Sequence, residues 1–567
     1  MCPRDLGANC GGNNVITVLR LNKEDSIALL TKGADKRWVM DTETDGLEVR
    51  GNIPKNEAKY IGLMPYGSQF CLIVARKDFD DWGLRPIVEG LRLVGHNLRF
   101  DLHALRLKPT VPWQDTMVAC YFNNTAGRKS MDHIARMYGW PKIKTPDLLK
   151  KGRIYDVPEP DLERYLADDC LITWRMSEVL QMDACEFDYR VDKAVYEMER
   201  RGVRLLPKRL SKVKERLDTL IDMSEHALRS AGFGGDGNSP KQVGDWLTKE
   251  GRHLPRTPKG NISTSKLVLQ KLADKGDNLV SLVLDWRKAV KLRSAFIEPL
   301  PKMTQNGLLY PQTNTTLTRT GRFSCSGPNL QQIPKRGALG KSIRSCLTSP
   351  GRTGVTACDF SQVELRVAAS FAGEEVLLSA FHSGGDPHTE VAAKMLGKTL
   401  ESITPDERFK AKAVNFGILN GMGAKRLAIE LKSTYDEAKK FLEEYKRNLP
   451  RLNEWMEGVW REAEAYGLAR TVSGRTRPFL ADEETRSAIS VIVQGSAAEL
   501  MRHSLVAVAE AGLEPILSVH DEVLIQGQGE GEKLKELMEY AANNAYTEFS
   551  NITFTASATE GDTWGDV

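Results

Sequence analysis

The sequence has no long apolar run, and its cysteines are not spaced like the ligands of a metal site. Its nine cysteines form no CxxC pair, which argues against a zinc site and against a disulfide framework. A membrane-spanning helix needs about 20 consecutive apolar residues, and no such run occurs. Residues 1–7 also lack the apolar core of a signal peptide. We therefore expect reduced thiols, no membrane association and a cytoplasmic location.

Net charge is also small, at +4, but it is unevenly distributed over the 567 residues. Residues 201–350 carry 27 Lys and Arg against 11 Asp and Glu, so the acidic excess lies in the rest of the chain. An evenly solvated surface would not divide charge in this way. A basic segment of this kind suits a polyphosphate partner such as a nucleic acid.

Residues 517–525 contain two short apolar segments joined by two adjacent carboxylates, Asp521 and Glu522. This pattern is typical of a β-hairpin with an acidic turn. Neighbouring strand residues point to opposite faces, so the two acids would converge only if the turn directs them toward a cation such as a divalent metal. An exposed acidic turn without a metal is the alternative that this stretch leaves open.

Three segments in the N-terminal third each carry acids in a predicted element. Asp41 and Glu43 end an apolar strand two residues apart, so they share a face. Asp101 ends a second apolar run and leads into a predicted helix. Tyr165 and Asp169 are four residues apart on another predicted helix, which places the phenol and the carboxylate on one face. Each acid alone is also compatible with a helix cap or a surface charge.

Together these patterns, Asp-x-Glu, Asn-x3-Asp and Tyr-x3-Asp in this order, resemble the motifs of DEDD-type 3′–5′ exonucleases, the proofreading domains of DNA polymerases. The resemblance implies an RNase H-like domain in which four carboxylates hold two Mg²⁺ ions, one generating hydroxide and the other stabilising the leaving 3′ oxygen. It implies metal ligation by Asp41, Glu43, Asp101 and Asp169, a water-orienting role for Tyr165 and a DNA contact for Asn97. Since no member of the pattern is missing, we expect an active nuclease.

The C-terminal half has a second set of candidate residues. The apolar run at 354–358 predicts a buried strand that ends in Asp359. Downstream, Arg408, Lys412, Phe416 and Asn420 recur every four residues, so they follow one slowly winding face of a helix. Two cations beside an aromatic ring suit a triphosphate with its sugar or base.

The segments DFSQVELR at 359–366, Arg408-x3-Lys412-x3-Phe416 and VHDEV at 519–523 resemble motifs A, B and C of family A DNA polymerases. Bacterial DNA polymerase I is the type member of that family, and the likeness covers almost the whole chain. It implies an α/β and α+β multidomain protein, with the RNase H-like 3′–5′ exonuclease domain followed by a right-hand polymerase domain of palm, fingers and thumb. Since no 5′-nuclease domain precedes the exonuclease motifs, we expect a polymerase like the large fragment, or a phage-type replicative enzyme.

The resemblance also implies a division of the chain. We expect an N-terminal extension at 1–29 whose first fifteen or so residues are disordered, an exonuclease domain at 30–190 and a polymerase domain at 191–567. Within the polymerase domain we expect the thumb at about 200–305, the palm at about 306–385 and 470–567, and the fingers at about 386–469.

The resemblance to family A also implies a role in polymerisation for each residue of this sequence that matches one of the family's motif positions. Two Mg²⁺ ions, for which Mn²⁺ can substitute, are expected on Asp359, Asp521 and the backbone carbonyl of Phe360, with Glu522 in a supporting role. Lys412 is expected to donate a proton to pyrophosphate. Nucleotide contacts are implied for Arg408, Lys412, Phe416, Asn420, Gln362, Glu364 and His388. DNA contacts are implied for Arg322, Asn329, Gln331, Arg486, Gln494 and His520.

Four of these positions bear on specificity. Phe416 implies discrimination against dideoxynucleotides, and Glu364 implies exclusion of a ribose 2′-OH. Phe360 stands where the type member has tyrosine, which leaves the metal-binding carbonyl intact. Asn420 stands where the family usually has tyrosine, and a small amide cannot reproduce the packing of that ring near the templating base. We therefore predict altered base selection.

The sequence as a whole predicts a DNA-directed DNA polymerase with proofreading that acts in replication. We expect primer-template DNA and dNTPs as partners, a monomer, and a location in the host cytoplasm if the chain is phage-encoded; a processivity factor is not identifiable. A catalytically silent DNA-binding module and an exonuclease without polymerase activity are the alternatives. The complete sets of carboxylates and cations argue against both, and reverse transcription stays open.

Overall fold

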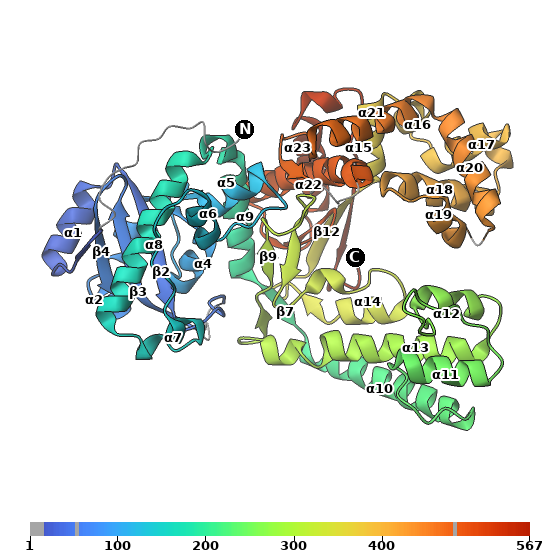
Figure 1. Cartoon of the computed structure of the whole chain (residues 1–567), viewed down its shortest axis with the longest axis horizontal. Helices are drawn as coiled ribbons and strands as arrows, with labels where there is room; N and C mark the ends of the chain where they lie inside the picture. The colour runs from blue at the N-terminus through green and yellow to red at the C-terminus, as the bar shows by residue number, and fades with distance from the viewer. Residues whose placement is uncertain (1–15, 52–55, 432, 480–484) are drawn as a thin grey trace. The chain divides into compact units, whose positions relative to one another are not determined.

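The computed structural model describes residues 16–51, 56–431, 433–479 and 485–567 (Figure 1). The disorder expected for the first fifteen residues lies outside the described part. The chain forms two compact units, and each is assembled from segments far apart in sequence. The first unit comprises Met1–Arg201, Gln312–Ser326 and Thr356–Thr559, and the second comprises Gly202–Pro311, Gly327–Val355 and Glu560–Val567.

A six-stranded sheet with the order β1-β4-β3-β2-β5-β6 organises the N-terminal part of the first unit. β3 pairs antiparallel with β2 and β4, whereas the other neighbours pair parallel. The strands are β1 (Thr17–Leu19), β2 (Arg37–Thr44), β3 (Ala58–Pro65), β4 (Phe70–Ala75), β5 (Arg92–Gly95) and β6 (Gln114–Asp115). Because β1 precedes residue 30, the sheet starts ahead of the expected boundary, and the division of the chain stays a prediction.

Helices cover this sheet and connect its strands. They are α1 (Lys23–Lys32), α2 (Arg76–Asp81), α3 (Arg85–Glu89), α4 (Leu98–Leu105), α5 (Thr116–Asn123), α6 (Met131–Met137), α7 (Asp147–Lys150), α8 (Glu159–Val179) and α9 (Glu186–Arg201). Trp38 of β2 packs in one apolar cluster, while its neighbour Val39 packs in another that includes Leu166 of α8. Side chains alternate along a strand, so Asp41 and Glu43 lie on the face that α8 covers.

A four-stranded sheet with the order β15-β16-β12-β17 forms the centre of the rest of the first unit. Its strands are β12 (Val355–Phe360), β15 (Pro515–Val519), β16 (Glu522–Gln526) and β17 (Ala556–Gly561). Two small antiparallel pairs accompany it, β9 (Gln312–Asn314) with β10 (Ser324–Ser326) and β13 (Leu468–Arg470) with β14 (Thr476–Pro478).

The helices of this part share one large apolar core with the four-stranded sheet. They are α15 (Val363–Ala372), α16 (Glu375–His382), α17 (Pro387–Leu396), α18 (Pro405–Leu419), α19 (Ala424–Glu430), α20 (Tyr435–Asn448), α21 (Pro450–Tyr466), α22 (Ala488–Glu510) and α23 (Gly531–Asn543). α18 begins at a capping box, in which the Thr404 hydroxyl accepts from the Glu407 N–H and the Glu407 carboxylate accepts from the Thr404 N–H.

A buried ionic network connects α9 to α22 within the first unit. Arg475 donates to Asp188 of α9 at 2.8 Å and to Glu499 of α22 at 2.8 Å, and Arg502 of α22 donates to the same Asp188 oxygen at 3.0 Å. All four side chains are almost fully buried. Removing one partner would leave an uncompensated buried charge, so this network constrains how the two helices pack.

The second unit contains the sheet β11-β7-β8 and most of the basic central segment. Its elements are β7 (Val203–Leu205), α10 (Pro207–Ser230), α11 (Pro240–Lys249), α12 (Lys266–Ala273), α13 (Asn278–Leu292), β8 (Leu308–Leu309), α14 (Ala338–Arg344) and β11 (Leu347–Thr348). Gly202, at φ +71°, follows α9, and a Cβ there would lie 2.6 Å from the Leu309 carbonyl oxygen. Glycine is therefore required at this turn.

Helices that could span a bilayer are absent from the described ranges. The seven cysteines in these ranges are buried, and none of them forms a disulfide bond there.

Candidate functional site

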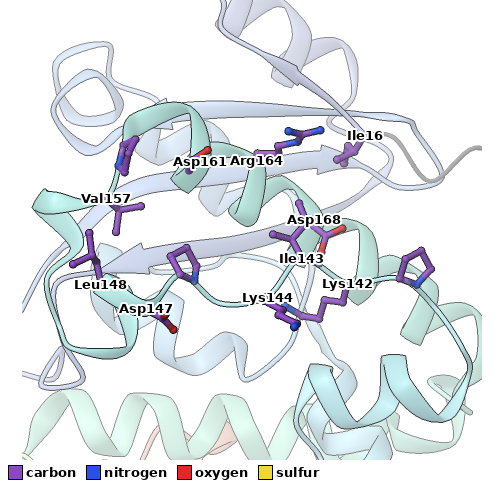
Figure 2. Close-up of a pocket in the computed structure, with 13 residues that line it drawn as sticks. Ile16, Lys142, Ile143, Lys144, Asp147, Leu148, Val157, Asp161, Arg164 and Asp168 are labelled. Atoms are coloured by element: carbon purple, nitrogen blue, oxygen red, sulfur yellow. Dashed lines mark hydrogen bonds between the residues drawn. The ribbon is translucent and has the colours of Figure 1, made fainter.

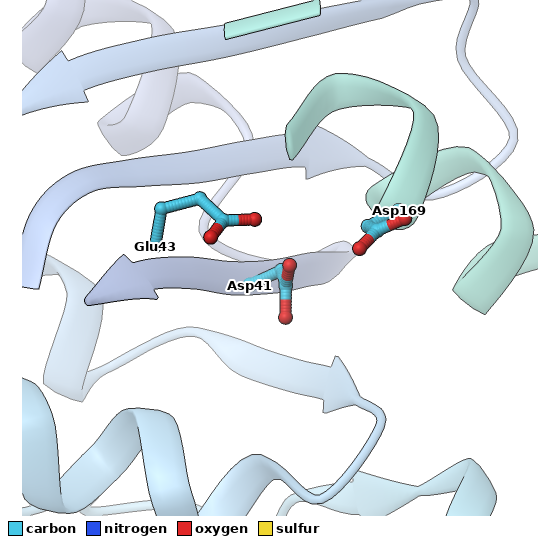
Figure 3. A group of neighbouring side chains, drawn as sticks. All are labelled: Asp41, Glu43 and Asp169. Atoms are coloured by element: carbon cyan, nitrogen blue, oxygen red, sulfur yellow. The ribbon is translucent and has the colours of Figure 1, made fainter. Parts of the chain in front are cut away.

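Asp41, Glu43 and Asp169 form an acidic cluster in the first unit (Figure 3). One carboxylate oxygen from each lies within 4.8 Å of the others, and all three side chains are buried. β2 supplies the first two and α8 supplies the third, because α8 packs across the face of the sheet on which Asp41 and Glu43 lie. The structure thus joins two patterns that are more than 120 residues apart.

Burial and mutual repulsion dominate the electrostatics of this cluster. Burial raises the pKa of Asp41 and Glu43 well above the usual range, and the neighbouring carboxylates raise both further. Burial also raises the pKa of Asp169 to about 6, against the opposing effects of Lys142 and a hydrogen bond from Tyr165. Carboxylate oxygens are the ligands that hard divalent cations prefer, so this donor set fits such a cation.

Asp101 lies next to the cluster but is held differently from our expectation. It belongs to the first turn of α4, which already begins at Leu98, and does not end a strand. The Thr42 hydroxyl donates to Asp101 Oδ1 at 2.6 Å, and both side chains are buried. Burial raises the pKa of Asp101 to about 8 although the hydrogen bonds from Thr42 oppose this shift. Its charge also raises the pKa of Asp41, so the two carboxylates act on one another.

Lys142 provides a cation inside the acidic cluster. Its Nζ lies 2.6 Å from Asp169 Oδ1 and 3.4 Å from Asp132 Oδ1, and its side chain is 7% exposed. Burial lowers the pKa of Lys142, but the Asp169 charge outweighs this effect and raises it above the usual value, so the amine stays protonated. Lys142 Nζ also lies 4.7 Å from the centre of the Tyr165 ring, whose hydroxyl is 3.2 Å from Thr145 Oγ1.

The segment that carries Lys142 borders a pocket of about 630 Å³ (Figure 2). Lys142, Lys144, Arg164 and Asp168 line it together with apolar side chains. The Ile143 N–H donates to Asp168 Oδ2 at 2.8 Å, which attaches the segment to α8.

Asn97, the predicted DNA contact near the acidic cluster, is exposed and has a left-handed backbone at φ 62°. The Asp115 carboxylate accepts from the backbone N–H groups of Asn97 at 3.0 Å and Leu98 at 2.8 Å. Asp115 thereby fixes the turn between β5 and α4 and sets the start of the helix that carries Asp101.

A second candidate site lies on the four-stranded sheet of the first unit. β15 and β16 pair antiparallel with Val519 opposite Glu522, so His520 and Asp521 form the predicted turn. Because β16 neighbours β12, the Phe360 N–H donates to the Asp521 carbonyl oxygen at 3.1 Å. Asp359, the residue before Phe360, therefore lies beside the acidic turn. Glu522 is 4% exposed, so an exposed turn of two acids is the wrong description of this hairpin.

A pocket of about 380 Å³ brings together many of the predicted polymerase residues. Arg322, Gln362, Glu364, Phe416, His520 and Asp521 line it. Gln362 has a left-handed backbone at φ 54° and directly precedes α15, and its Oε1 is a buried acceptor without a hydrogen-bond donor among the described residues. The pocket therefore combines cationic, anionic, amide and aromatic groups.

A chain of polar contacts crosses the same region. Arg322 contacts Glu364 through its guanidinium and donates to Gln494 Oε1 at 3.3 Å. Gln494 Nε2 in turn donates to Asn420 Oδ1 at 2.6 Å, and Asn420 Nδ2 donates to the Phe416 carbonyl oxygen at 2.8 Å. Asn420, the departure noted in the sequence, thus connects the end of α18 to Arg322.

Arg408, Lys412 and Phe416 lie along α18 as predicted, and Asn420 forms its C-cap. Arg408 pairs with both oxygens of Asp386, at 2.8 and 3.0 Å. Lys412 Nζ lies 6.0 Å from the centre of the Phe416 ring.

His388 is buried beside the Phe416 ring, and its Nδ1 accepts from Asn415 Nδ2 at 2.8 Å. Burial, together with Lys412 and Arg408, lowers the pKa of His388 to about 4, so the imidazole is neutral at pH 7.

The remaining predicted DNA contacts are dispersed. Arg486 is exposed, and its carbonyl oxygen accepts from Trp460 Nε1 at 3.3 Å. Asn329 and Gln331 belong to the second unit, at a 3₁₀ turn formed by Leu330–Gln332. Asn329 Oδ1 is a buried acceptor without a donor within the ranges that the structure describes.

Four residues at these sites were not predicted from the sequence. Lys142 contacts Asp169 of the acidic cluster, and Thr42 contacts Asp101 beside it. Asp115 fixes the Asn97 turn, and Asp386 pairs with Arg408. Only Asp115 had a local signal, because an acid directly before a helical segment is a common N-cap. The other three depend on contacts between segments far apart in the chain.

Known proteins resemble this chain in sequence and in fold. The profile of the family described as DNA polymerase family A matches residues 207–566. "DNA polymerase I, thermostable" of Thermus thermophilus is 33% identical over 458 residues, which cover 77% of this chain and 53% of that protein. DNA polymerase I of Borreliella burgdorferi is 30% identical over 510 residues, covering 84% of this chain and 56% of that protein. The chain therefore spans about half the length of these curated relatives.

The structure also resembles a solved one, described as the POL domain of Pol1 from M. smegmatis in complex with DNA primer-template and dNTP. The two share a TM-score of 0.83 at 23% identity, with 96% of this chain and 99% of that chain covered. This likeness confirms the expected mixed α/β multidomain fold class.

Proposed function

Because the chain belongs to DNA polymerase family A, we propose that it extends a primer 3′ end on a DNA template, using dNTPs and releasing pyrophosphate. The hydrogen bond between the Phe360 N–H and the Asp521 carbonyl oxygen carries this proposal. It holds Asp359, near the end of β12, beside the turn that carries Asp521, and Asp521 lines the pocket together with Arg322, Glu364 and Phe416.

Asp359, Asp521 and the Phe360 carbonyl would hold two Mg²⁺ ions, for which Mn²⁺ can substitute. When bound, these ions lower the pKa of the primer 3′-OH and stabilise the leaving pyrophosphate. Arg408 and Lys412 bind the triphosphate, and Lys412 donates the proton that pyrophosphate takes up.

The ring of Phe416 packs on the deoxyribose. Glu364, which Arg322 holds in place, fills the space that a ribose 2′-OH would need, so the protein selects deoxynucleotides. His520, Gln494, Arg486, Asn329 and Gln331 would contact the primer and template strands.

A second activity, 3′–5′ exonuclease proofreading, is favoured by the cluster of Asp41, Glu43 and Asp169 with Asp101 beside it. These four carboxylates would hold two divalent ions that activate water and stabilise the leaving 3′ oxygen. Tyr165, whose hydroxyl lies near Thr145 and Asp169, orients the attacking water, and Asn97 contacts the displaced strand.

One primer-extension experiment tests both activities. A labelled primer annealed to a longer template is incubated with the protein and Mg²⁺, with and without four dNTPs. We expect extension in the first reaction and shortening in the second. Asp521→Asn should abolish only extension, and Asp41→Ala only shortening. Shortening alone in the parent chain would indicate an exonuclease without polymerase activity, and DNA binding without either reaction would contradict the enzymatic proposal.

These proposals extend to the division of the chain into domains, its oligomeric state and its location. We place the exonuclease domain at 30–190 and the polymerase domain at 191–567, with a thumb at about 200–305 whose many basic residues follow the duplex. We propose a monomer that acts in the cytoplasm as a phage-type replicative polymerase. The buried free thiols support a reducing compartment.

A further inference from the structure

Lys142 occupies an unusual place for a lysine, within hydrogen-bond distance of a carboxylate in the acidic cluster. Its Nζ is 2.6 Å from Asp169 Oδ1, and only 7% of the side chain is exposed. A divalent ion bound to that oxygen would lie at about 2.1 Å from it, so the ion and the ammonium group could not both keep this position without strong repulsion.

The segment around Lys142 is attached to α8 at three nearby points, so this placement is built into the fold. Besides the Lys142 contact with Asp169, the Ile143 N–H donates to Asp168 Oδ2 at 2.8 Å. Thr145 Oγ1 lies 3.2 Å from the Tyr165 hydroxyl. The backbone that follows Lys142 is thereby attached to α8, whereas the long Lys142 side chain has a second acceptor within reach.

A second acceptor for the same amine is already close. Asp132 Oδ1 lies 3.4 Å from Lys142 Nζ, and the Asp132 side chain is 55% exposed. Lys142 also borders the 630 Å³ pocket beside Lys144 and Asp168, which gives the flexible side chain room to move (Figure 2). A shift of the amine from Asp169 toward Asp132 therefore needs no change in the backbone.

We propose that Lys142 is a tethered cation that competes with a divalent ion for Asp169. In the absence of metal it compensates part of the charge of Asp41, Glu43 and Asp169. When an ion binds Asp169, the amine transfers to Asp132. The site then has two ion positions. Asp41 and Glu43 hold the first ion, and the second ion, at Asp169, binds with lower affinity, so its occupancy depends on the metal concentration. The consequence for DNA shortening rests on the proposed nuclease function, whereas the competition itself does not.

Mn²⁺ binding tests the competition directly. The full chain with Asp359→Asn and Asp521→Asn, which weaken the other metal site, is titrated with Mn²⁺ in a calorimeter. Adding Lys142→Met should make the weaker ion bind about tenfold more tightly, because its competitor is gone. Lys142→Arg should stay within about twofold of the parent, since the positive charge remains. Lys144→Met removes the same charge from the same segment and should also have little effect.

Asp132→Asn should act in the opposite direction. Without its second acceptor the amine leaves Asp169 less readily, so Mn²⁺ should bind about threefold more weakly. This variant keeps the proposal testable if Lys142→Met unfolds, which a thermal melt in EDTA would reveal. Equal or weaker Mn²⁺ binding by a folded Lys142→Met chain would overturn the proposal, because Lys142 would then support the metal site. An effect equal to that of Lys144→Met would also overturn it.

The same variants separate this proposal from the nuclease function. If the parent chain shortens primers, Lys142→Met should lower the Mg²⁺ concentration needed for half-maximal shortening by about tenfold. If the parent chain does not shorten primers although Asp41→Ala removes Mn²⁺ binding, the nuclease proposal fails while the competition stands.

Discussion

The backbone N–H of Phe360 donates to the carbonyl oxygen of Asp521 at 3.1 Å, although 161 positions separate the two residues in the chain. This hydrogen bond ties the end of β12 to the turn between β15 and β16. It places Asp359, near the end of β12, beside Asp521 in that turn, as the proposed polymerase site requires. The relative position of these two acids depends on strand pairing, which is rigid compared with a loop.

Asp521→Asn should reduce the rate of primer extension by about 100-fold or more and leave the rate of primer shortening unchanged. The amide keeps the shape of the turn but removes a charged metal ligand. Single-turnover extension with a saturating primer-template measures the loss. Glu514→Gln, at the opposite end of the same hairpin, is the matched control and should retain activity. Comparable losses in both variants would mean that the hairpin has been distorted.

Asn420→Tyr should lower misincorporation by about threefold to tenfold, because a ring at this position restricts the space beside the templating base. It also removes the Asn420 acceptor of Gln494, which now connects α18 to Arg322. Single-nucleotide insertion kinetics with correct and incorrect dNTPs give the ratio. Asn420→Asp keeps the size and the acceptor, so its ratio should change less. An unchanged ratio in Asn420→Tyr would refute the predicted effect on base selection.

Thr42→Val should slow primer shortening by about tenfold without affecting extension. The substitution removes the 2.6 Å hydrogen bond to Asp101 and leaves a buried carboxylate oxygen with one donor fewer, at a cost of about 1–3 kcal/mol. The rate of shortening of a single-stranded oligonucleotide measures the effect. Thr44→Val is the control, because Thr44 ends the same strand and its hydroxyl donates to the Gly46 carbonyl oxygen and not to an acid. Equal slowing in both variants would argue against a specific role for Thr42.

Glu199→Gln should lower stability at neutral pH, and the deficit should shrink in acid. Burial alone would raise the pKa of Glu199, but Arg50, Arg99 and His103 outweigh it and hold the pKa at about 2. A depressed pKa contributes stability above the ordinary value near 4.5, and this contribution is lost as the pH falls toward 2. The shift corresponds to on the order of 3 kcal/mol.

Proteolysis of the full chain across a urea gradient, at pH 7 and at pH 3, measures this difference. Glu197→Gln, on the same helix but paired with Arg200 in a partly exposed ion pair, is the control and should change little at either pH. A deficit of the same size at both pH values would show that Glu199 acts through its hydrogen bonds and not through its charge.

The local periodicity of the sequence was enough to predict several strands and helices and the residues that share a face on them. Alternation along a strand predicted that Asp41 and Glu43 share a face, and both lie on β2. A spacing of four residues predicted that Tyr165 and Asp169 share one helix and that Arg408 and Lys412 share another. The structure confirms both helices, α8 and α18. The hairpin at 515–526 was also predictable, since two short apolar segments flank its turn. These features depend on contacts within a few residues, which the order of residue types encodes directly.

Only the tertiary structure decided which of these local features meet. In the structure, Asp101 lies on a helix next to Thr42, and Asp169 lies close to Asp41. Lys142 contacts Asp169, and Arg408 pairs with Asp386. Such pairings join segments whose separation carries no periodic signal. They follow from how the apolar faces of whole helices and sheets pack, and that packing is decided by the sum of many weak contacts, so no short motif reveals it.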